Sequence, residues 1–480
     1  MDKLLLVQLI YYILLIAVCI QIVYETNSTA KSLAYLLLVI FIPLLGMIIY
    51  FLVGINYRHR KMYSRKLIQN RYAGKRLRAI IRQYSENIFI TNNENLDQHK
   101  KLAIMAVKDI ESPLTGNNAV KVLQNGEEKF PALVNALLEA RHHIHIEYYI
   151  YEDDEIGRQL ENILVKKAQE GVRIRFIYDD FGSNSIRKLV KRLKTAGIQV
   201  FPFLKVSFFE FASKLNYRNH RKIIIIDGRT GFVGGINVSD KYINDRNRLY
   251  WRDTHLRIDG PGVMYLQYIF LCDWNFCAKE SLQPDAYFFP RDLPQKNDNK
   301  IVQITASGPD SDTPAILFSL LQAINLATEE ILITSPYFIP GESLSNALMM
   351  ASLSGVKVRL LTAGISDSRI VNAAAKSYFN DLLKAGVEIY LYKKGFVHAK
   401  TMITDKRLSI VGTANMDNRS FELNFEVNAI VYDAEVAAQL RHSFYQDINN
   451  AEKIDALSWN NRPRSIQLIE KIARLLSPML

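Results

Sequence analysis

Two short stretches of the chain carry the same series of reactive and anion-binding side chains. The first copy contains a histidine, a lysine, an aspartate, a glycine pair and an asparagine, at His220, Lys222, Asp227, Gly234, Gly235 and Asn237. The second copy lies 178 residues later and has a threonine for the second glycine, at His398, Lys400, Asp405, Gly412, Thr413 and Asn415. Two copies with identical spacing indicate a duplicated site, because one copy could arise by chance and a matched pair rarely does.

The residues around each histidine predict how its side chain is positioned. The apolar runs 223–226 and 401–404 follow directly and read as short buried strands. Alternation along a strand then places each histidine on the same face as the lysine two residues later. The glycines let the backbone pass close to a ligand, and the asparagine adds a neutral donor. Each copy therefore offers an imidazole, an ammonium and an amide at one sheet edge.

Two such half-sites suit a two-step displacement at phosphorus. One histidine attacks phosphorus, while the other protonates the leaving oxygen and later deprotonates the incoming one. Four side chains would stabilise charge on the non-bridging oxygens, namely Lys222, Lys400, Asn237 and Asn415. We expect no metal and no cofactor, because the protein supplies the positive charge. For Asp227 and Asp405 we expect a supporting structural role, since an aspartate between a strand and a turn most often forms the turn.

The doubled HxKxxxxD pattern, with its Gly-rich turn and asparagine, resembles the mark of the phospholipase D superfamily. The resemblance covers residues 119–433, and neither copy departs from the motif. It implies a catalytic α/β fold of two pseudo-symmetric αβα sandwich halves. It also implies an acid some 25 to 35 positions after each histidine that would fix the tautomer and stabilise the imidazolium. Asp253 and Glu426 lie at those positions, with Asp259 and Glu422 as alternatives.

An internal duplication is also visible outside the motifs. Residues 119–295 and 296–480 each show strands alternating with helices, and Ala196-Gly-Ile198 corresponds to Ala385-Gly-Val387. This rhythm predicts βαβ-type units with parallel strands covered by helices. We expect the active site at the seam between the halves, with one histidine from each.

The N-terminal segment 1–57 contains two apolar runs, residues 4–24 and 33–55, separated by a short polar turn. Each run is long enough as a helix to cross about 30 Å of hydrocarbon. We therefore predict a two-helix transmembrane hairpin, with Pro43 kinking the second helix. A cleaved signal peptide is the alternative for the first run, but its basic region is weak and no small-residue cleavage site is evident.

A basic stretch follows the second apolar run. Ten Lys and Arg side chains and no acid lie between Arg58 and Arg82, and this stretch supplies most of the net charge of +12. By the positive-inside rule it predicts a multi-pass protein of the cell membrane with a cytoplasmic catalytic unit. The stretch would face anionic headgroups and either bind them or serve only as a topology signal. Nucleic acid is disfavoured as a partner because the basic stretch adjoins the bilayer. We expect residues 58–118 to form this juxtamembrane segment and a polar connector.

Two further apolar features bear on lipid contact. Between the first half and His220 lies an apolar loop, with side chains Val206, Phe208, Phe209 and Phe211, that would either join the core or dip into the membrane interface. At the C-terminus, residues 465–480 space apolar residues helically, with basic residues opposite. Docking on the core and contact with a membrane surface both fit that pattern. The three cysteines form no disulfide framework.

The membrane segment together with the doubled motif is similar to the bacterial cardiolipin synthases. That resemblance implies a phosphatidyltransferase that uses phosphatidylglycerol, with a phosphohistidine on His220 and proton transfer by His398. Other phosphatidyltransferases, or a phospholipid hydrolase, would use the same site with a different acceptor. A non-catalytic lipid-binding protein is a third hypothesis, which the two intact motifs oppose. The sequence indicates neither the oligomeric state nor the acyl-chain preference.

Overall fold

The structure is a computed structural model that describes residues 3–25, 29–51, 85–86, 88–89, 94–205, 217–244, 249–280, 282–283, 285, 287–290, 298–366 and 368–477. The chain divides into two compact units, residues 1–68 with 206–217 and residues 69–205 with 218–480. Apart from residues 206–217, both predicted halves of the catalytic region belong to the second unit. The basic stretch 58–82 and the apolar side chains at 206–211 lie outside the described residues.

The N-terminal unit contains three described helices, α1 (Lys3–Glu25), α2 (Thr29–Phe41) and α3 (Pro43–Ile49). Within the described part of the chain, one helix is long and apolar enough to cross a membrane, at Gln8–Glu25. The second apolar run is not one continuous helix, so the expected two-helix hairpin is not confirmed. Pro43 has no amide hydrogen and a fixed φ, and α2 ends at Phe41, with the non-helical Ile42 between it and Pro43. The chain then folds back and brings Gly46 so close to the backbone of Leu38 that a side chain at position 46 would collide with it.

The first half of the catalytic unit alternates strands with helices much as its sequence predicts. Its strands are β1 (Leu114–Gln124), β2 (His143–Tyr148), β3 (Arg173–Tyr178), β4 (Gln199–Pro202), β5 (Lys222–Ile226), β6 (Thr230–Gly234), β7 (Tyr250–Arg252) and β8 (Thr254–Asp259). Its helices are α7 (Asn125–Glu139), α8 (Glu155–Gln169), α9 (Arg187–Thr195), the short 3₁₀ helix η3 (Asp240–Tyr242) and α11 (Val263–Ala278). Two helices precede it, α5 (Glu94–Asp97) and α6 (Lys100–Ile110), within the stretch expected to be a connector.

The second half repeats this order. Its strands are β9 (Lys300–Ser307), β10 (Glu330–Thr334), β11 (Phe338–Ile339), β12 (Lys357–Ala363), β13 (Glu388–Tyr392), β14 (Gly395–Val397), β15 (Thr401–Thr404), β16 (Leu408–Gly412), β17 (Met416–Asp417), β18 (Glu426–Tyr432) and β19 (Ala451–Lys453). Its helices are α12 (Ala315–Leu326), α13 (Gly341–Leu353), α14 (Arg369–Lys384), α15 (Asn418–Glu422), α16 (Ala434–Ile448), α17 (Ala456–Asn460) and α18 (Arg464–Arg474).

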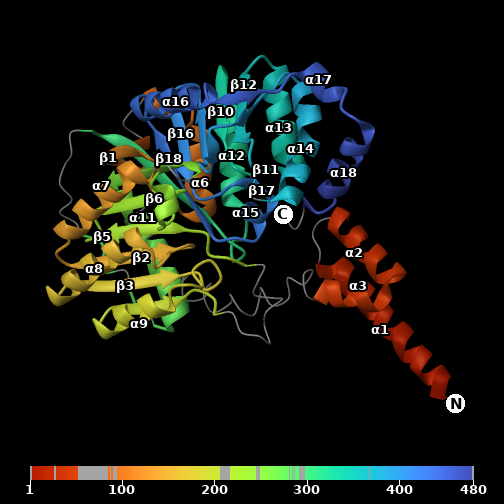
Figure 1. Ribbon diagram of the computed structural model, residues 1–480, viewed down its shortest axis with the longest axis horizontal. Coiled ribbons are helices and arrows are strands. Elements are labelled where there is room, and N and C mark those ends of the chain that lie inside the picture. Colours follow the sequence, from red (N-terminus) through yellow and green to blue (C-terminus); the bar gives the residue numbers. More distant parts are fainter. Residues whose placement is uncertain are drawn as a thin grey trace. The chain divides into compact units, whose positions relative to one another are not determined.

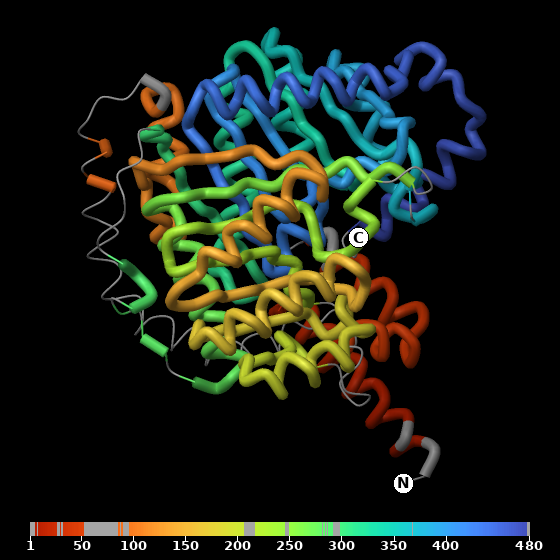
Figure 2. Tube along the Cα trace, turned by 60° about the vertical axis from the view of Figure 1, so that its left-hand side comes forward, coloured from red at the N-terminus to blue at the C-terminus, as the bar shows by residue number. Residues whose placement is uncertain are grey.

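One sheet runs through both halves, in the order β19-β13-β12-β10-β15-β16-β18-β9-β1-β8-β6-β5-β2-β3-β4. The halves therefore share a sheet, joined where β9 pairs with β1, and they lie side by side in Figures 1 and 2. Among the described strands of this sheet, parallel pairing, as predicted for βαβ units, occurs in β2-β3-β4 and β10-β12-β13. The strands that follow the two histidines, β5 and β15, run antiparallel to β2 and β10.

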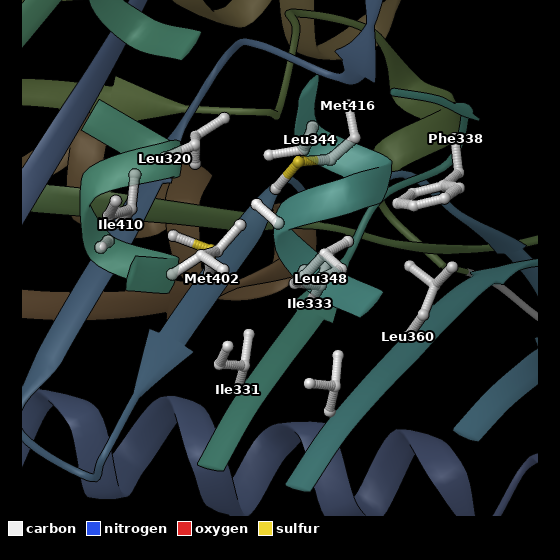
Figure 3. Packing of buried hydrophobic residues seen from close by; sticks show 14 of the residues in the cluster. Leu320, Ile331, Ile333, Phe338, Leu344, Leu348, Leu360, Met402, Ile410 and Met416 are labelled. Atoms are coloured by element: carbon white, nitrogen blue, oxygen red, sulfur yellow. The ribbon is translucent and has the colours of Figure 1, made fainter. Parts of the chain in front are cut away.

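Helices cover both faces of this sheet, which gives each half its sandwich. On β10, Ile331 and Ile333 pack with α12 and α13 in a large apolar cluster, part of which is shown in Figure 3. Glu330, on the opposite face of the same strand, accepts hydrogen bonds from Arg441 (2.8 Å) and Tyr445 (2.6 Å) of α16. The alternation of β10 thus directs apolar side chains to one helical layer and an ionic contact to the other.

Candidate active site

Backbone hydrogen bonds cross the seam between the halves on both sides of the site. On one side, β14 pairs in parallel with β7, and the amide of His398 donates to the carbonyl of Arg252 at 2.7 Å. On the other side, Asn219 forms a bridge to Phe425, and the amide of His220 donates to the carbonyl of Phe425 at 3.0 Å. Each histidine is therefore held by the backbone of the opposite half.

Each histidine side chain also binds an acid of the opposite half. Nδ1 of His220 lies 2.9 and 3.0 Å from the two carboxylate oxygens of Glu426. Nδ1 of His398 lies 2.7 Å from Oδ2 of Asp253. A carboxylate on Nδ1 holds the hydrogen there, which leaves Nε2 as the nitrogen with a lone pair for attack or proton transfer.

The two acids found at these positions match those expected from sequence, but their partners are exchanged. The sequence interpretation paired each histidine with the acid that follows it, and that pairing is wrong. Residues Arg252 and Phe425, directly before the acids, are hydrogen-bonded to the histidine of the other half, so the acids face the other half as well. Of the alternatives, Asp259 instead binds Thr230 (2.6 Å) and Arg257 (3.0 Å), and Glu422 ends α15.

The Gly-rich turn of each motif also contacts one of the two acids, Asp253 or Glu426. A Cβ on Gly235 would overlap the carboxylate of Asp253, so only glycine fits there. At the equivalent position Thr413 has a hydroxyl, and this hydroxyl donates to Glu426. The longer glutamate leaves room for that contact. Within the motif residues, glycine at position 235 thus goes with the shorter acid Asp253, and threonine at position 413 goes with the longer acid Glu426.

The two lysines lie beside the histidines as strand alternation predicts. Nζ of Lys222 donates to the carbonyl of His220 at 2.7 Å, and Nζ of Lys400 donates to the carbonyl of His398 at 2.6 Å. Both side chains are buried. An ammonium donates up to three hydrogen bonds and carries a positive charge, so the pair can bind an anion between the two imidazoles.

The two asparagines occupy buried positions close to the site. Nδ2 of Asn237 donates to the hydroxyl of Tyr242 at 2.8 Å, and its Oδ1 accepts from the amide of Ile150 at 3.2 Å. Asn415 is buried, and its backbone amide donates to the hydroxyl of Ser420 at 3.2 Å. Among the described residues Nδ2 of Asn237 donates to Tyr242 alone, so its second hydrogen can bind a ligand oxygen.

Asp227 and Asp405 lie at the other end of their strands and bind backbone. The carboxylate of Asp227 accepts from the amides of residues 141, 142 and 143 at 2.7–2.9 Å, where β2 begins. The carboxylate of Asp405 accepts from the amides of residues 328, 329 and 330 at 2.8–3.0 Å, where β10 begins. Both contacts tie the histidine-bearing strand to its neighbour, which is the structural role expected.

The surroundings of the two imidazoles differ. Tyr149 stands edge-on to His220, with ring centroids 4.8 Å apart. His398 is surrounded by the aromatic rings of Trp251, Phe396 and Tyr242, at 5.6–5.9 Å. The site is thus pseudo-symmetric in its reacting groups but not in its walls.

Burial and the enclosed charges set the protonation of the site. Burial lowers the pKa of His220 to about 4, although the carboxylate of Glu426 opposes the shift. Burial, reinforced by Lys400 and Lys222, holds the pKa of His398 well below its usual value. Burial also lowers the pKa of Lys222 to about 7 and raises the pKa of Asp253 to about 6. Both imidazoles are therefore neutral near pH 7 when no anion is bound.

Two buried arginines donate hydrogen bonds to the backbone carbonyls of the two acids, and neither was predicted from the sequence. Nε of Arg221 donates to the carbonyl of Glu426 at 3.3 Å, and its Nη1 pairs with Asp273 on α11. Nη1 of Arg252 donates to the carbonyl of Asp253 at 2.6 Å, and its Nε binds Asp447 at 2.8 Å. The position of Arg221 between His220 and Lys222 was the available signal, because alternation sends it to the opposite face.

Among the residues that the structure describes, no group of three or more His, Cys, Asp and Glu side chains is arranged to hold a metal ion. The prediction that the reaction needs no metal remains to be tested.

Comparison with known proteins agrees with the motif and extends it over the whole chain. Residues 133–255 and 320–448 match the family described as cardiolipin synthase, PLD-like domain, and residues 11–54 match the phospholipase D-nuclease N-terminal family. A cardiolipin synthase of Oceanobacillus iheyensis is 40% identical over 472 residues, 98% of either chain. The chain belongs to the cardiolipin synthase family. The major cardiolipin synthase of Bacillus subtilis is 39% identical, again over 98% of both chains.

Membership in this family makes the protein a phospholipase D-type phosphatidyltransferase that acts on phospholipid and associates with membranes. The fold also resembles the phosphatidylserine synthase of Haemophilus influenzae, with a TM-score of 0.60 at 14% identity over 81% of this chain and all of that one. At that level of identity the likeness concerns the fold alone.

Proposed function

We propose that this enzyme makes cardiolipin and glycerol from two molecules of phosphatidylglycerol, through a phosphatidyl group carried on His220. The observation that supports this most is the pair of crossed histidine–carboxylate contacts with a buried lysine beside each imidazole. In the first step Nε2 of His220 attacks phosphorus, and the bond from phosphorus to the headgroup glycerol oxygen breaks. His398 gives its proton to that oxygen, and glycerol leaves.

The second step reverses the roles. His398 takes the proton from the terminal hydroxyl of a second phosphatidylglycerol, whose oxygen attacks phosphorus and displaces His220. One phosphodiester is exchanged for another, so the reaction is reversible and needs no energy source. His398 must be protonated at the start, whereas its pKa is depressed in the empty site. The negative charge of a bound phosphodiester favours the imidazolium and counteracts that depression.

Two lysines and two asparagines would bind the phosphate group of the substrate. Lys222 and Lys400 are the groups we assign to the non-bridging oxygens, together with Asn237 and Asn415. Asp253 and Glu426 orient and stabilise the imidazoles without touching phosphorus. Asp227 and Asp405 support the strands.

We further propose that the protein crosses the cell membrane more than once and keeps its catalytic unit in the cytoplasm. Helix α1 supplies one span, and we assign the other to the apolar run 33–55, in which α2 and α3 would have to open out of their folded-back arrangement to cross the bilayer. The basic residues after it favour the cytoplasmic side. Labelling single cysteines at Asn27 and at Gln439 in intact cells with a membrane-impermeant reagent tests this. Only the first should react, and reaction at Gln439 would overturn the topology.

Lipid analysis after incubation of the purified protein with phosphatidylglycerol as the sole phospholipid tests the reaction. We expect cardiolipin and glycerol in equal amounts. Phosphatidic acid with glycerol and no cardiolipin would show a hydrolase instead. Unchanged phosphatidylglycerol, with binding retained, would favour the lipid-binding hypothesis.

A further inference from the structure

The C-terminal helix α18 packs against the catalytic unit with its polar side and turns its apolar side outward. It lies along α14 in Figure 1. Its large aliphatic side chains face away from the protein, with Ile469 61%, Ile472 55% and Leu475 78% exposed. Three more are also exposed, Ile466, Leu468 and Leu476. A helix that docks on a core normally buries this stripe, so the orientation is the reverse of ordinary packing.

Polar contacts fix this orientation. The carboxylate of Glu470 is buried and accepts two hydrogen bonds from Arg462, at 2.7 and 2.9 Å. The guanidinium of Arg474 lies 4.2 Å from the ring centroid of Tyr378 on α14. Past the end of the helix, the carbonyl of Ser477 accepts from Nδ2 of Asn418 at 3.1 Å. These contacts lie on the inward side, so the helix cannot bury its aliphatic side chains by a small rotation.

We propose that the outward face of α18 lies in the interface of an anionic phospholipid membrane. The charges of the helix fit that partner, because its one acid, Glu470, is paired with Arg462 while Arg464 and Lys471 are exposed. At 100° per residue, Arg464 and Lys471 both fall beside the aliphatic stripe, where long basic side chains reach lipid phosphates. An apolar face bordered by basic residues is the pattern of helices that lie in the membrane plane.

The helix is also fixed near the catalytic residues. Asn418, which binds Ser477, follows the candidate phosphate-binding Asn415 by three residues. A membrane held against α18 is therefore held close to the edge of the sheet where the histidines lie. This contact goes beyond the proposed function, since it holds whichever phospholipid is the substrate.

Fluorescence of the full-length protein in nanodiscs tests the contact directly. An environment-sensitive dye is attached at Ile469→Cys, with Cys19, Cys272 and Cys277 replaced by alanine. The His220→Ala background keeps the lipid composition constant. We expect a blue-shifted emission that is quenched by spin-labelled acyl chains in discs containing phosphatidylglycerol. The control is Ala438→Cys on the exposed side of α16, where the dye should report water. A dye at position 469 that behaves like the control would overturn the proposal.

An activity measurement separates this contact from the catalytic mechanism. The triple variant Ile469→Gln, Ile472→Gln, Leu475→Gln should fold normally, because these side chains are exposed. We expect about tenfold lower kcat/KM on vesicle lipid, because the apolar contact with the bilayer is lost. Turnover of a short-chain, water-soluble phosphatidylglycerol should be unchanged. The proposal would be contradicted if the variant were as active as the wild type on vesicle lipid as well as on the short-chain lipid. A wild type that is inactive on both lipids would instead count against the proposed function.

A second copy of the chain is the alternative occupant of this face. In that case the dye at position 469 would shift to the blue in detergent without lipid, in step with formation of a dimer measured by light scattering. The triple variant would then be monomeric, and the membrane proposal would be wrong.

Discussion

The imidazole of His220 in the first half binds the carboxylate of Glu426 in the second, with Nδ1 2.9 Å from the nearer oxygen. The mirror contact joins His398 to Asp253. Neither half therefore holds a complete histidine–acid pair of its own. The two motifs form one site only when both halves are folded together.

The crossed contacts predict which variants resemble one another. Glu426→Gln should reproduce the defect of His220→Ala, and Asp253→Asn that of His398→Ala, each with turnover lowered about 10²–10⁴-fold. A phosphatidyl ester of p-nitrophenol separates the pairs, because this leaving group needs no acid. We expect a burst of p-nitrophenol from Asp253→Asn and none from Glu426→Gln. The opposite pattern would exchange the roles of the two histidines.

Double variants test the same pairing independently. Losses from His220→Ala and Glu426→Gln should not add, since the acid acts through that imidazole. Combining Glu426→Gln with Asp253→Asn should lower turnover further than either does alone. If the non-additive combination were instead His220 with Asp253, the crossed geometry would not describe the working enzyme.

Arg221 should act as a positioning residue, because it holds the backbone of Glu426 and reaches no reacting atom. Arg221→Met should lower kcat about ten- to hundredfold with little change in KM, since a small displacement of a reacting group is costly. Arg221→Lys should recover part of the loss. Thermal unfolding of both variants provides the control. A proportional loss of folded protein and of activity would reduce the role of Arg221 to stability.

Lys222 should weaken the fold in a pH-dependent way. Its pKa is about 7 in the folded protein and about 10.4 in an unfolded chain. Between these values the unfolded state binds more protons, so the stability of the wild type rises with pH. Lys222→Met should therefore raise Tm most below pH 7, and the gain should shrink toward pH 10, while turnover is lost. Lys406→Met, at an exposed position, should change Tm little at any pH. A gain in Tm from Lys222→Met that does not vary with pH would contradict the argument.

Asp227 should matter for stability and not for chemistry. Asp227→Ala removes the side-chain acceptor of three backbone amides and should cost about 2–4 kcal/mol of unfolding free energy. Asp227→Asn should cost less, because asparagine tolerates the φ of 53° at this position. Both variants should retain near-normal turnover per folded molecule at low temperature. Loss of turnover in fully folded protein would assign Asp227 to the reaction.

The motif spacing predicted that each histidine lies beside its lysine, because strand alternation is a local property, and the internal duplication predicted a site at the seam between the halves. Neither could predict the crossed pairing, which depends on β7 lying beside β14, two strands separated by well over a hundred residues. The break at Ile42 was foreseeable from Pro43, but the chain folding back on itself was not. The aliphatic spacing at 466–476 predicted a helix. Its outward orientation depends on contacts that the spacing does not show, of Glu470 with Arg462 just before the helix and of Arg474 with Tyr378 on α14.

The central claim is that the phosphatidyl group is carried on His220 while His398 transfers protons. The most direct measurement is mass spectrometry of the Asp253→Asn variant after reaction with the p-nitrophenyl ester, quenched at alkaline pH to preserve phosphohistidine. Attack does not need His398 with this substrate, but release to an alcohol does, so the intermediate should accumulate. We predict a phosphatidyl group on the peptide that contains His220. A modification on His398, or a burst without any modified histidine, would contradict the account.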